Sequence, residues 1–396
     1  MSNAKNQWLN FVCILWACFC LFSCGSDSKS NSPETALEYS YKQPELKGDG
    51  WQTAHLSDYS IDVEPYEKLV DKINRNALNY RHIDSVTIIK EEKIIFEQSF
   101  RTSLDLADSW ANNQDLELHI LNSVTKSVTS ALIGIAIDQD YIDSVNVKVH
   151  DYFQHKLPVD NWHESKGDIT LKNWLTMQHG YLWDEWNVSY LNSSNLNSQM
   201  NNAIDPMHFL LSRPMASMPG EEFAYSTGVS FGIGRLLEYA TEQSVTNFME
   251  QNLFAPLGIE KYTYWSLDNQ LHTGSALYLS TRDMAKFGQL FLNKGIWQGE
   301  QVISESWVNE STQQHFAAAS WGYGYQWWTT QFTVGNDIVS TYYADGYGGQ
   351  YIFVMPALEL VVVFTGRAYQ EGDMDEYKVR TIMETDILPT LLINSY

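Results

Sequence analysis

The chain has 396 residues, of which 44% are hydrophobic and 18% are charged, and its formal net charge is −23. A chain of this length and apolar content can bury a large core, which excludes an intrinsically disordered protein. The excess of 48 acidic over 25 basic residues argues against a nucleic-acid-binding protein, because a phosphate backbone is bound by surface lysines and arginines. We expect one large or two medium globular domains.

The N-terminal segment has the layout of an export signal. An apolar stretch from Trp8 to Phe22 follows a short polar start and is too short to favour a transmembrane helix. It ends in Leu21-Phe22-Ser23-Cys24, which resembles a bacterial lipobox, where cleavage before the cysteine leaves that cysteine to carry lipid. All four cysteines lie in or directly after this stretch, at Cys13, Cys18, Cys20 and Cys24.

We therefore expect a signal peptide over residues 1–23 and lipidation of Cys24. The exported protein would then be anchored by lipid at a bacterial envelope membrane and face the periplasm. An ordinary signal peptide and an uncleaved anchor are the alternatives. Residues 24–50 are polar and begin with a Gly/Ser/Asp/Asn-rich run, which predicts a tether before a folded domain over residues 51–396.

The first part of the folded region is predicted to contain a helix and a hairpin. The helix is expected over residues 66–77. Two β-branched runs, 86–90 and 94–98, flank Glu91-Glu92-Lys93 in the manner of a β-hairpin. From Ser123 the apolar residues recur at helical spacing. Further helices are expected at 171–177, 207–211, 230–240, 245–253 and 282–292.

Strand character returns near the C-terminus, at residues 323–329, 351–354 and 360–365, and a last helix is expected over 376–387. Strands at both ends and helices between them indicate an α+β fold, in which an antiparallel sheet is flanked by helices. A mostly helical region, roughly residues 125–270, is inserted in it. The absence of a regular βαβ alternation argues against a doubly wound parallel sheet.

Two local patterns place a serine where it can act as a nucleophile. The first is Ser123-Val124-Thr125-Lys126, at the start of a strongly apolar helix. Residues i and i+3 share one face of a helix, so the amine of Lys126 is expected beside the hydroxyl of Ser123. The helix N-terminus favours developing negative charge, and apolar neighbours favour a neutral amine that can accept a proton.

The second pattern is Gly228-Val229-Ser230-Phe231-Gly232, a formal match to the G-x-S-x-G nucleophile elbow. That motif requires a strand directly before the serine, whereas residues 218–223 are predicted to form a turn. We therefore interpret Ser230 as a packing or helix-start residue.

Three motifs in order make the chain resemble the serine β-lactamase and penicillin-binding-protein-like hydrolases. Ser123 and Lys126 match the S-x-x-K motif, and the segment from Pro219 to Gly228 resembles the second motif, in which Tyr-x-Asn follows a Pro-Gly turn. Residues 344–350, Ala-Asp-Gly-Tyr-Gly-Gly-Gln, match the glycine pattern of the third motif. Further similar stretches lie at 169–177, 275–285 and 292–297. The resemblance covers residue 50 to the end and is nearest the class C β-lactamase branch, with its esterases and 6-aminohexanoate-dimer hydrolases.

This resemblance implies a β-lactamase/transpeptidase-like fold and assigns roles to individual residues. Ser123 would be the acylated nucleophile, Lys126 would help to remove its proton, and Tyr225 would shuttle protons as a phenolate stabilised by Lys126. The backbone N–H groups of Ser123 and Tyr347 would form the oxyanion hole, with Gly346 allowing close approach of the substrate strand. An ordinary half-buried aromatic is the alternative for Tyr225.

Two departures from the family pattern bear on the substrate. Thr227 stands where the second motif has an amide, and Ala344 stands where the third motif has Lys or His, beside the acidic Asp345. A cation that would meet a β-lactam or peptide carboxylate is therefore missing. Trp183, Asp184, Thr227 and Asp345 are candidates for a substrate rim. The acids of the segment 183–186 could receive a cationic group, with a solvated loop as the alternative.

The sequence carries no metal or nucleotide signature. The histidines show neither H-x-H nor H-x-x-x-H spacing, and no Walker A loop or Rossmann fingerprint precedes a suitable helix. We expect no cofactor. The leading hypothesis is a serine hydrolase of the S-x-x-K type that cleaves a small ester or amide through an acyl-enzyme. The alternatives are a penicillin-recognising protein, such as a β-lactamase or D-Ala-D-Ala carboxypeptidase, and a catalytically silent envelope binding protein.

Overall fold

The computed structural model describes residues 39–369 and 377–392. The predicted signal peptide, Cys24 and the first part of the predicted tether lie outside these residues. Residues 39–50, also assigned to the tether, belong to the fold. The buried Tyr41 donates its hydroxyl to the carbonyl of Ile95 at 2.8 Å, and the Asp49 carboxylate accepts from Arg282 at 2.9 Å. The predicted domain start at residue 51 is therefore too late, because a polar composition hides single anchoring side chains.

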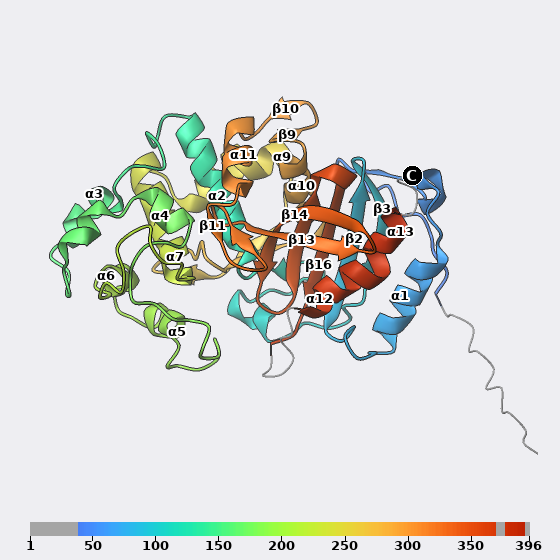
Figure 1. The fold of residues 1–396 in the computed structure, drawn as a ribbon, viewed down its shortest axis with the longest axis horizontal. Coiled ribbons are helices and arrows are strands. Elements are labelled where there is room, and N and C mark those ends of the chain that lie inside the picture. The colour runs from blue at the N-terminus through green and yellow to red at the C-terminus, as the bar shows by residue number, and fades with distance from the viewer. Residues whose placement is uncertain (1–38, 370–376, 393–396) are drawn as a thin grey trace, which may run out of the picture. The chain divides into compact units, whose positions relative to one another are not determined.

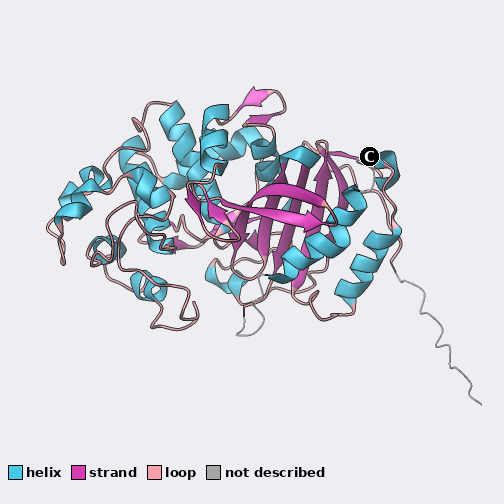
Figure 2. Cartoon of the chain, in the orientation of Figure 1, coloured by secondary structure: helices cyan, strands magenta, loops and turns pink. Residues whose placement is uncertain are grey.

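Within the described residues, nine strands form the central sheet in the order β1-β3-β2-β16-β15-β14-β13-β12-β11 (Figures 1 and 2). Their bounds are β1 Gln52–Thr53, β2 Ile83–Lys90, β3 Lys93–Ser99, β11 Phe316–Ala317, β12 Gly322–Tyr323, β13 Trp328–Val334, β14 Asp337–Gly346, β15 Gln350–Met355 and β16 Leu360–Gly366. All neighbours in it are antiparallel except β1 with β3. The N-terminal β2 pairs with the C-terminal β16, which confirms the predicted sheet from distant parts of the chain.

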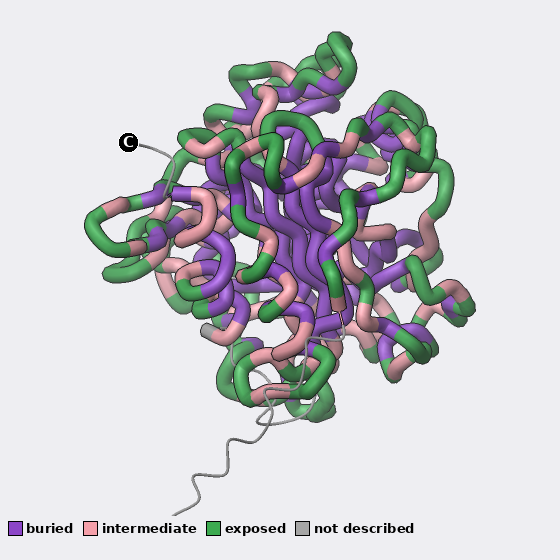
Figure 3. Tube along the Cα trace, turned by 90° about the vertical axis from the view of Figure 1, so that its right-hand side faces the viewer, coloured by how far each residue is buried: buried purple, intermediate pink, exposed green. Residues whose placement is uncertain are grey.

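Both faces of the sheet are covered, as the buried strands in Figure 3 show. In β16, Val361 and Val363 pack in the same cluster as α10 (Thr281–Leu292), whereas Val362 and Phe364 pack in a second cluster. That second cluster contains residues of α1 (Glu64–Asn74), α12 (Tyr377–Ile382) and α13 (Leu388–Leu392). A strand buried on both faces is apolar at every position, which explains the continuous Leu-Val-Val-Val-Phe run.

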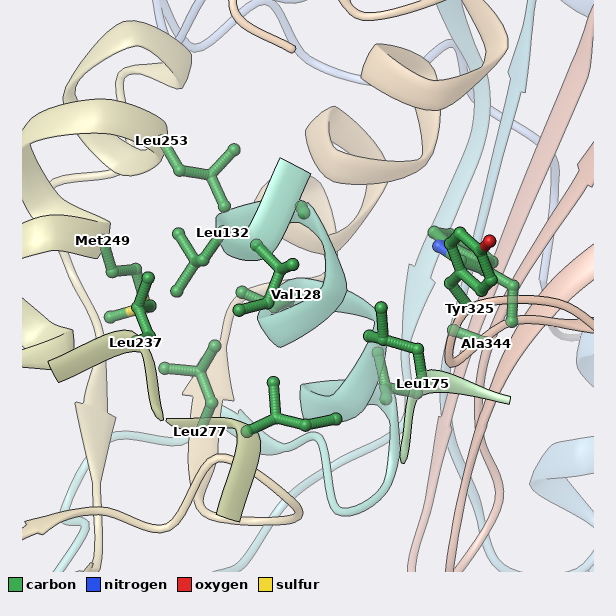
Figure 4. Close-up of a cluster of buried hydrophobic side chains, with 14 of the residues drawn as sticks. Val128, Leu132, Leu175, Leu237, Met249, Leu253, Leu277, Tyr325 and Ala344 are labelled. Carbon is green, nitrogen blue, oxygen red and sulfur yellow. The ribbon is translucent and has the colours of Figure 1, made fainter. Parts of the chain in front are cut away.

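A helical region is inserted between the N-terminal and C-terminal strands, as predicted. Its helices are α2 Val124–Asp138, α3 Val149–Tyr152, α4 Leu171–Leu175, α5 Leu196–Asn201, α6 Pro206–Leu211, α7 Thr227–Thr241, α8 Val245–Met249 and α9 Ala255–Leu257. Helix α2 is buried around its circumference from Val124 to Ala136, because it lies at the centre of this region. In Figure 4, Val128 and Leu132 of α2 lie in one cluster with Leu237 of α7 and with Met249 and Leu253.

Glycine permits the close packing of α7 against the loop before β8. A Cβ atom at Gly234 would lie 2.4 Å from the Oγ1 of Thr273, a distance that real Cβ contacts do not show. The remaining strands are β4 His119–Ile120, β5 Thr263–Tyr264, β6 Ser266–Leu267, β7 Gln270–Leu271, β8 Leu277–Leu279, β9 Ile296–Trp297 and β10 Glu300–Gln301, and the remaining α-helix is α11 Glu305–Thr312.

The C-terminal strands differ from the prediction in two places. The predicted strand 323–329 is two strands, β12 and β13, separated by a turn in which Gln326 has φ 62°. Strand β14 is missing from the periodicity-based prediction, because Asp337, Ser340 and Thr341 interrupt its run of apolar residues. Its burial nevertheless alternates, with Val339, Thr341 and Tyr343 buried.

Candidate active site

The site is built around Ser123, the residue that immediately precedes α2. Ser123 already has helical backbone angles (φ −67°, ψ −10°), and its side chain makes no capping bond to the helix. The hydroxyl oxygen of a serine at a helix N-cap usually accepts such a bond from a backbone N–H of the first turn. The Ser123 hydroxyl is instead available to other groups, and it lines a pocket of about 420 Å³.

Lys126 lies one helical turn further on and points back to Ser123. Its Nζ is 3.0 Å from the Ser123 Oγ, 3.0 Å from the Thr227 Oγ1 and 2.8 Å from the Gly274 carbonyl oxygen. The residue is only 1% exposed, and burial lowers the pKa of the Lys126 amine to about 8, against a raising effect of Glu185. The structure thus brings together the serine and lysine that the S-x-x-K spacing predicts, with an amine that deprotonates near neutral pH.

Tyr225 lies beside the Ser123–Lys126 pair. Its ring centroid is 4.9 Å from Lys126 Nζ. Burial, with Tyr323 and the negative charge of Glu185, raises the Tyr225 pKa well above its usual value, and the Ser123 side chain opposes that rise. This direction is opposite to the one that the phenolate implied by the resemblance requires. A phenol with a raised pKa is a candidate proton donor, and Lys126 is the stronger candidate base.

Aromatic rings fix the orientation of Tyr225. Its ring stacks on Trp186 at 5.1 Å between centroids and on Trp328 at 5.7 Å. Trp186 comes from the loop before α5 and Trp328 from β13, so the phenol is held between the helical region and the sheet. Offset stacks of this kind add to the stability that burial alone provides.

Glu185 is a buried carboxylate that sequence analysis did not single out. It is 1% exposed and accepts hydrogen bonds on both oxygens. Thr227 donates its backbone N–H at 2.7 Å and its hydroxyl at 2.6 Å, the Trp183 indole donates at 2.7 Å, and Tyr190 donates its hydroxyl at 2.8 Å. Thr227, the departure from the second motif, thus connects Lys126 to Glu185.

The predicted substrate rim separates into buried and exposed residues. Trp183 is buried and serves as a donor to Glu185. Asp184 is exposed, and its carboxylate accepts bonds from Trp186 and Asn187 within its own loop. Asp184 does not line the pocket at Ser123. For Asp184 the structure therefore favours the solvated loop over the rim.

The third motif reaches the site at the end of β14. A Cβ atom at Gly346 would lie 2.2 Å from the carbonyl oxygen of Leu121, so only glycine lets the strand approach the loop before α2. The Asn122 side chain then donates to the Tyr347 carbonyl at 2.6 Å. These contacts place Tyr347 and Ser123 on the wall of one pocket. Asp345 is close enough to raise the pKa of Tyr225.

The pocket walls carry no charged side chain. They are formed by amides, hydroxyls and aromatic rings: Trp110, Asn122, Ser123, Tyr190, Leu191, Asn197, Ser198, Asn201, Thr227, Trp265, Ser266, Ser275 and Tyr347. Lys126 and Glu185 lie beneath this surface. A pocket with such walls suits an uncharged ligand, because a buried unpaired charge is costly.

Ser230, the alternative nucleophile, lies inside α7 and is completely buried. Its hydroxyl contacts the Gln326 side-chain oxygen at 2.7 Å and the Ser226 carbonyl at 3.4 Å. No strand leads into it, because α7 begins at Thr227 after a turn. Ser230 is therefore a packing residue, as interpreted from the sequence.

Among residues 39–369 and 377–392, no group of three His, Cys, Asp or Glu side chains is placed to hold a metal ion. In the same part of the chain, no helix has both the length and the apolar character needed to cross a membrane.

The large antiparallel sheet, the inserted helical region and the Ser–Lys pair at the start of a buried helix define the β-lactamase/transpeptidase fold class. The family model described as Beta-lactamase matches residues 80–385. The chain therefore belongs to the Beta-lactamase family, a family of hydrolases. No curated protein sequence is similar to the chain at a significant level.

Solved structures share this fold at low sequence identity. One described as a 6-aminohexanoate-dimer hydrolase from Bacillus anthracis has a TM-score of 0.65 at 19% identity, over 81% of this chain and 82% of its own. A penicillin binding protein from Bacillus halodurans has a TM-score of 0.60 at 16% identity, over 79% and 99%. A family VIII carboxylesterase has a TM-score of 0.60 at 15% identity, over 83% and 98%. At these identities the likeness establishes the fold alone.

Proposed function

We propose that this protein is a serine hydrolase that cleaves a small, uncharged ester or amide through an acyl-enzyme on Ser123. The observation that carries the proposal is the 3.0 Å contact between the Ser123 Oγ and the buried Lys126 amine, at the wall of a pocket that opens on Ser123. A nucleophilic serine needs a base within hydrogen-bond reach, and this amine is neutral above about pH 8.

Acylation follows from the positions of three side chains. Neutral Lys126 takes the proton of Ser123 while Oγ bonds to the substrate carbonyl carbon, and the C=O electron pair moves onto oxygen. The N–H groups of Ser123 and Tyr347 stabilise that oxyanion. When the carbonyl re-forms, the bond to the leaving group breaks and Tyr225 donates its proton to the leaving oxygen or nitrogen. Lys126 then returns a proton to Tyr225, and water repeats the sequence to release the acid and free Ser123.

The proposed substrate is uncharged because of the pocket walls and the third motif. No cationic side chain lines the pocket, Ala344 replaces the motif's Lys or His, and Asp345 adds negative charge near Tyr225. A substrate carboxylate would find no partner. This disfavours β-lactams and peptide C-termini, although the family includes penicillin-recognising proteins.

Hydrolysis measurements with matched variants test the proposal. Wild-type protein, Ser123→Ala and Ser230→Ala are compared on p-nitrophenyl butyrate, a small amide and a penicillin reporter. We expect ester or amide turnover by the wild type and Ser230→Ala, and its loss in Ser123→Ala. Hydrolysis unchanged by Ser123→Ala would support the catalytically silent alternative, and acylation by the penicillin reporter would support the penicillin-recognising one.

We also propose that the protein is exported and anchored by lipid through Cys24. The support is the lipobox-like Leu21-Phe22-Ser23-Cys24 and the polar run that follows it. Expression of the full chain with Cys24→Ser should move the protein from the membrane fraction to the soluble periplasmic fraction. Retention of this variant in membranes would contradict a lipid anchor.

A further inference from the structure

The four hydrogen bonds to Glu185 determine the direction of a chain of hydrogen bonds that ends at Ser123. An ionised carboxylate can only accept, so the Thr227 hydroxyl, 2.6 Å away, uses its single proton on Glu185. The Thr227 oxygen is then left with lone pairs only. Towards Lys126 Nζ, 3.0 Å away, it can act only as an acceptor.

The same reasoning applies to the second neighbour of Lys126. The Gly274 carbonyl, 2.8 Å from Nζ, also accepts and cannot donate. A neutral amine has two N–H bonds and one lone pair, and both N–H bonds are used by Thr227 and Gly274. The lone pair is left on the side that faces Ser123 Oγ at 3.0 Å, where a base must accept the serine proton.

We propose that Glu185 is a positioning residue, which acts through Thr227 to aim the lone pair of Lys126 at Ser123. This inference rests on the proposed serine-hydrolase function and deepens it. It also accounts for the departure in the second motif: a hydroxyl backed by a buried carboxylate stands in place of an amide. Glu185 does not touch the reacting atoms, because Thr227 lies between it and Lys126.

The charge of Glu185 gives a second way to detect its action on Lys126. Burial lowers the pKa of Lys126 to about 8, and Glu185 opposes this shift. The other titratable neighbours are neutral near pH 7, since the Tyr225 pKa is raised well above its usual value and the His272 pKa is lowered to about 3. Asp345, which acts on Tyr225, is unchanged by any variant below. Removal of the Glu185 charge should therefore lower the Lys126 pKa further.

The test compares Glu185→Gln with Asp184→Asn, an exposed carboxylate in the same loop that lies outside the pocket. A glutamine amide can donate to the Thr227 oxygen, which frees the Thr227 proton to bind the lone pair of Lys126. We expect Glu185→Gln to lose about 10- to 100-fold in kcat with little change in KM, within the range that a positioned base contributes. The acid limb of its kcat/KM profile should move to lower pH. Asp184→Asn should leave kcat and the acid limb unchanged.

A second pair of variants keeps the test decisive if Glu185→Gln folds poorly. Thr227→Val removes the hydroxyl at nearly constant volume, and Thr227→Ser restores it. We expect Thr227→Val to lose kcat and Thr227→Ser to recover most of that loss, with circular dichroism confirming that both are folded. A folded Glu185→Gln or Thr227→Val that keeps the wild-type kcat and acid limb would overturn the inference.

Failure of the inference and failure of the proposed function are distinguishable by covalent labelling. If a fluorophosphonate probe does not modify Ser123 in the wild-type protein, the proposed function fails. If it modifies Ser123 equally fast, with the same pH dependence, in the wild type and in Glu185→Gln, only the role of Glu185 fails.

Discussion

The Nζ of Lys126 lies 3.0 Å from the Oγ of Ser123, and Lys126 is 1% exposed to solvent. The short distance follows from helical geometry, because residues i and i+3 share a face. The burial follows from the packing of α2 at the centre of the helical region. Together they place beside Ser123 an amine whose pKa is lowered by burial to about 8.

Activity should rise with pH through the pKa of Lys126. The protonated amine cannot accept the Ser123 proton, so kcat/KM for an uncharged ester should be low at pH 6 and half-maximal near pH 8. The measurement is a kcat/KM profile corrected for spontaneous ester hydrolysis. A profile that is flat from pH 6 to pH 9 would show that Lys126 is not the base.

Replacement of Lys126 by methionine should remove activity without unfolding the protein. Methionine keeps a long apolar stem in a buried position and carries no charge to desolvate. We expect a loss of at least about 100-fold in kcat/KM, from the loss of the general base. The melting temperature, followed by circular dichroism, should not fall, which separates a chemical effect from a structural one.

Replacement of Tyr225 by phenylalanine should affect poor leaving groups more than good ones. Tyr225 is a neutral phenol beside Ser123, and we assign it the proton that the leaving group takes. An alkyl amide needs that proton, whereas p-nitrophenolate leaves without it. We expect a loss of about 100-fold or more on an amide and about 10-fold or less on a p-nitrophenyl ester. Equal losses on both substrates would contradict this role.

Replacement of Gly346 by alanine should disturb the oxyanion site. The added Cβ atom would lie 2.2 Å from the Leu121 carbonyl oxygen and would push the end of β14 away from Ser123. We expect kcat to fall by about 100-fold, the loss associated with one oxyanion donor. Gly167→Ala is the matched control, because a Cβ atom there meets no atom within 4 Å.

Replacement of Ser230 by alanine should change stability and leave catalysis intact. Ser230 lies inside α7, and its hydroxyl donates to the side-chain oxygen of Gln326. Loss of one buried hydrogen bond costs about 1 kcal/mol. Urea unfolding should report that decrease, while kcat stays at the wild-type value. A large loss of kcat in a folded Ser230→Ala protein would reopen the nucleophile-elbow interpretation.

The parts of the site that local patterns could predict differ from the parts that tertiary packing creates. The Ser123–Lys126 contact lies within one helical turn, so its spacing predicts it. The pKa of Tyr225 depends on burial between distant elements, and a motif contains no information on that burial. Burial raises this pKa, whereas the expected phenolate requires a lowered one.

The buried position of Glu185 could not be predicted for the same reason. In the sequence it is one of two adjacent acids between two tryptophans, and nothing in the pattern tells the exposed Asp184 from the buried Glu185. The difference arises when the loop folds back and brings Glu185 to the start of α7, 42 residues away, where it accepts from Thr227. Strand β14 was missed because Asp337, Ser340 and Thr341 interrupt its run of apolar residues.

The most direct test of the central claim is covalent labelling by a fluorophosphonate probe, followed by peptide mapping of the modified serine. The account predicts a single modified residue, Ser123, with a labelling rate that rises through about pH 8. Label should persist in Ser230→Ala and disappear in Ser123→Ala and Lys126→Met. Modification of any other serine, or a folded wild-type protein that takes no label across this pH range, would contradict the account.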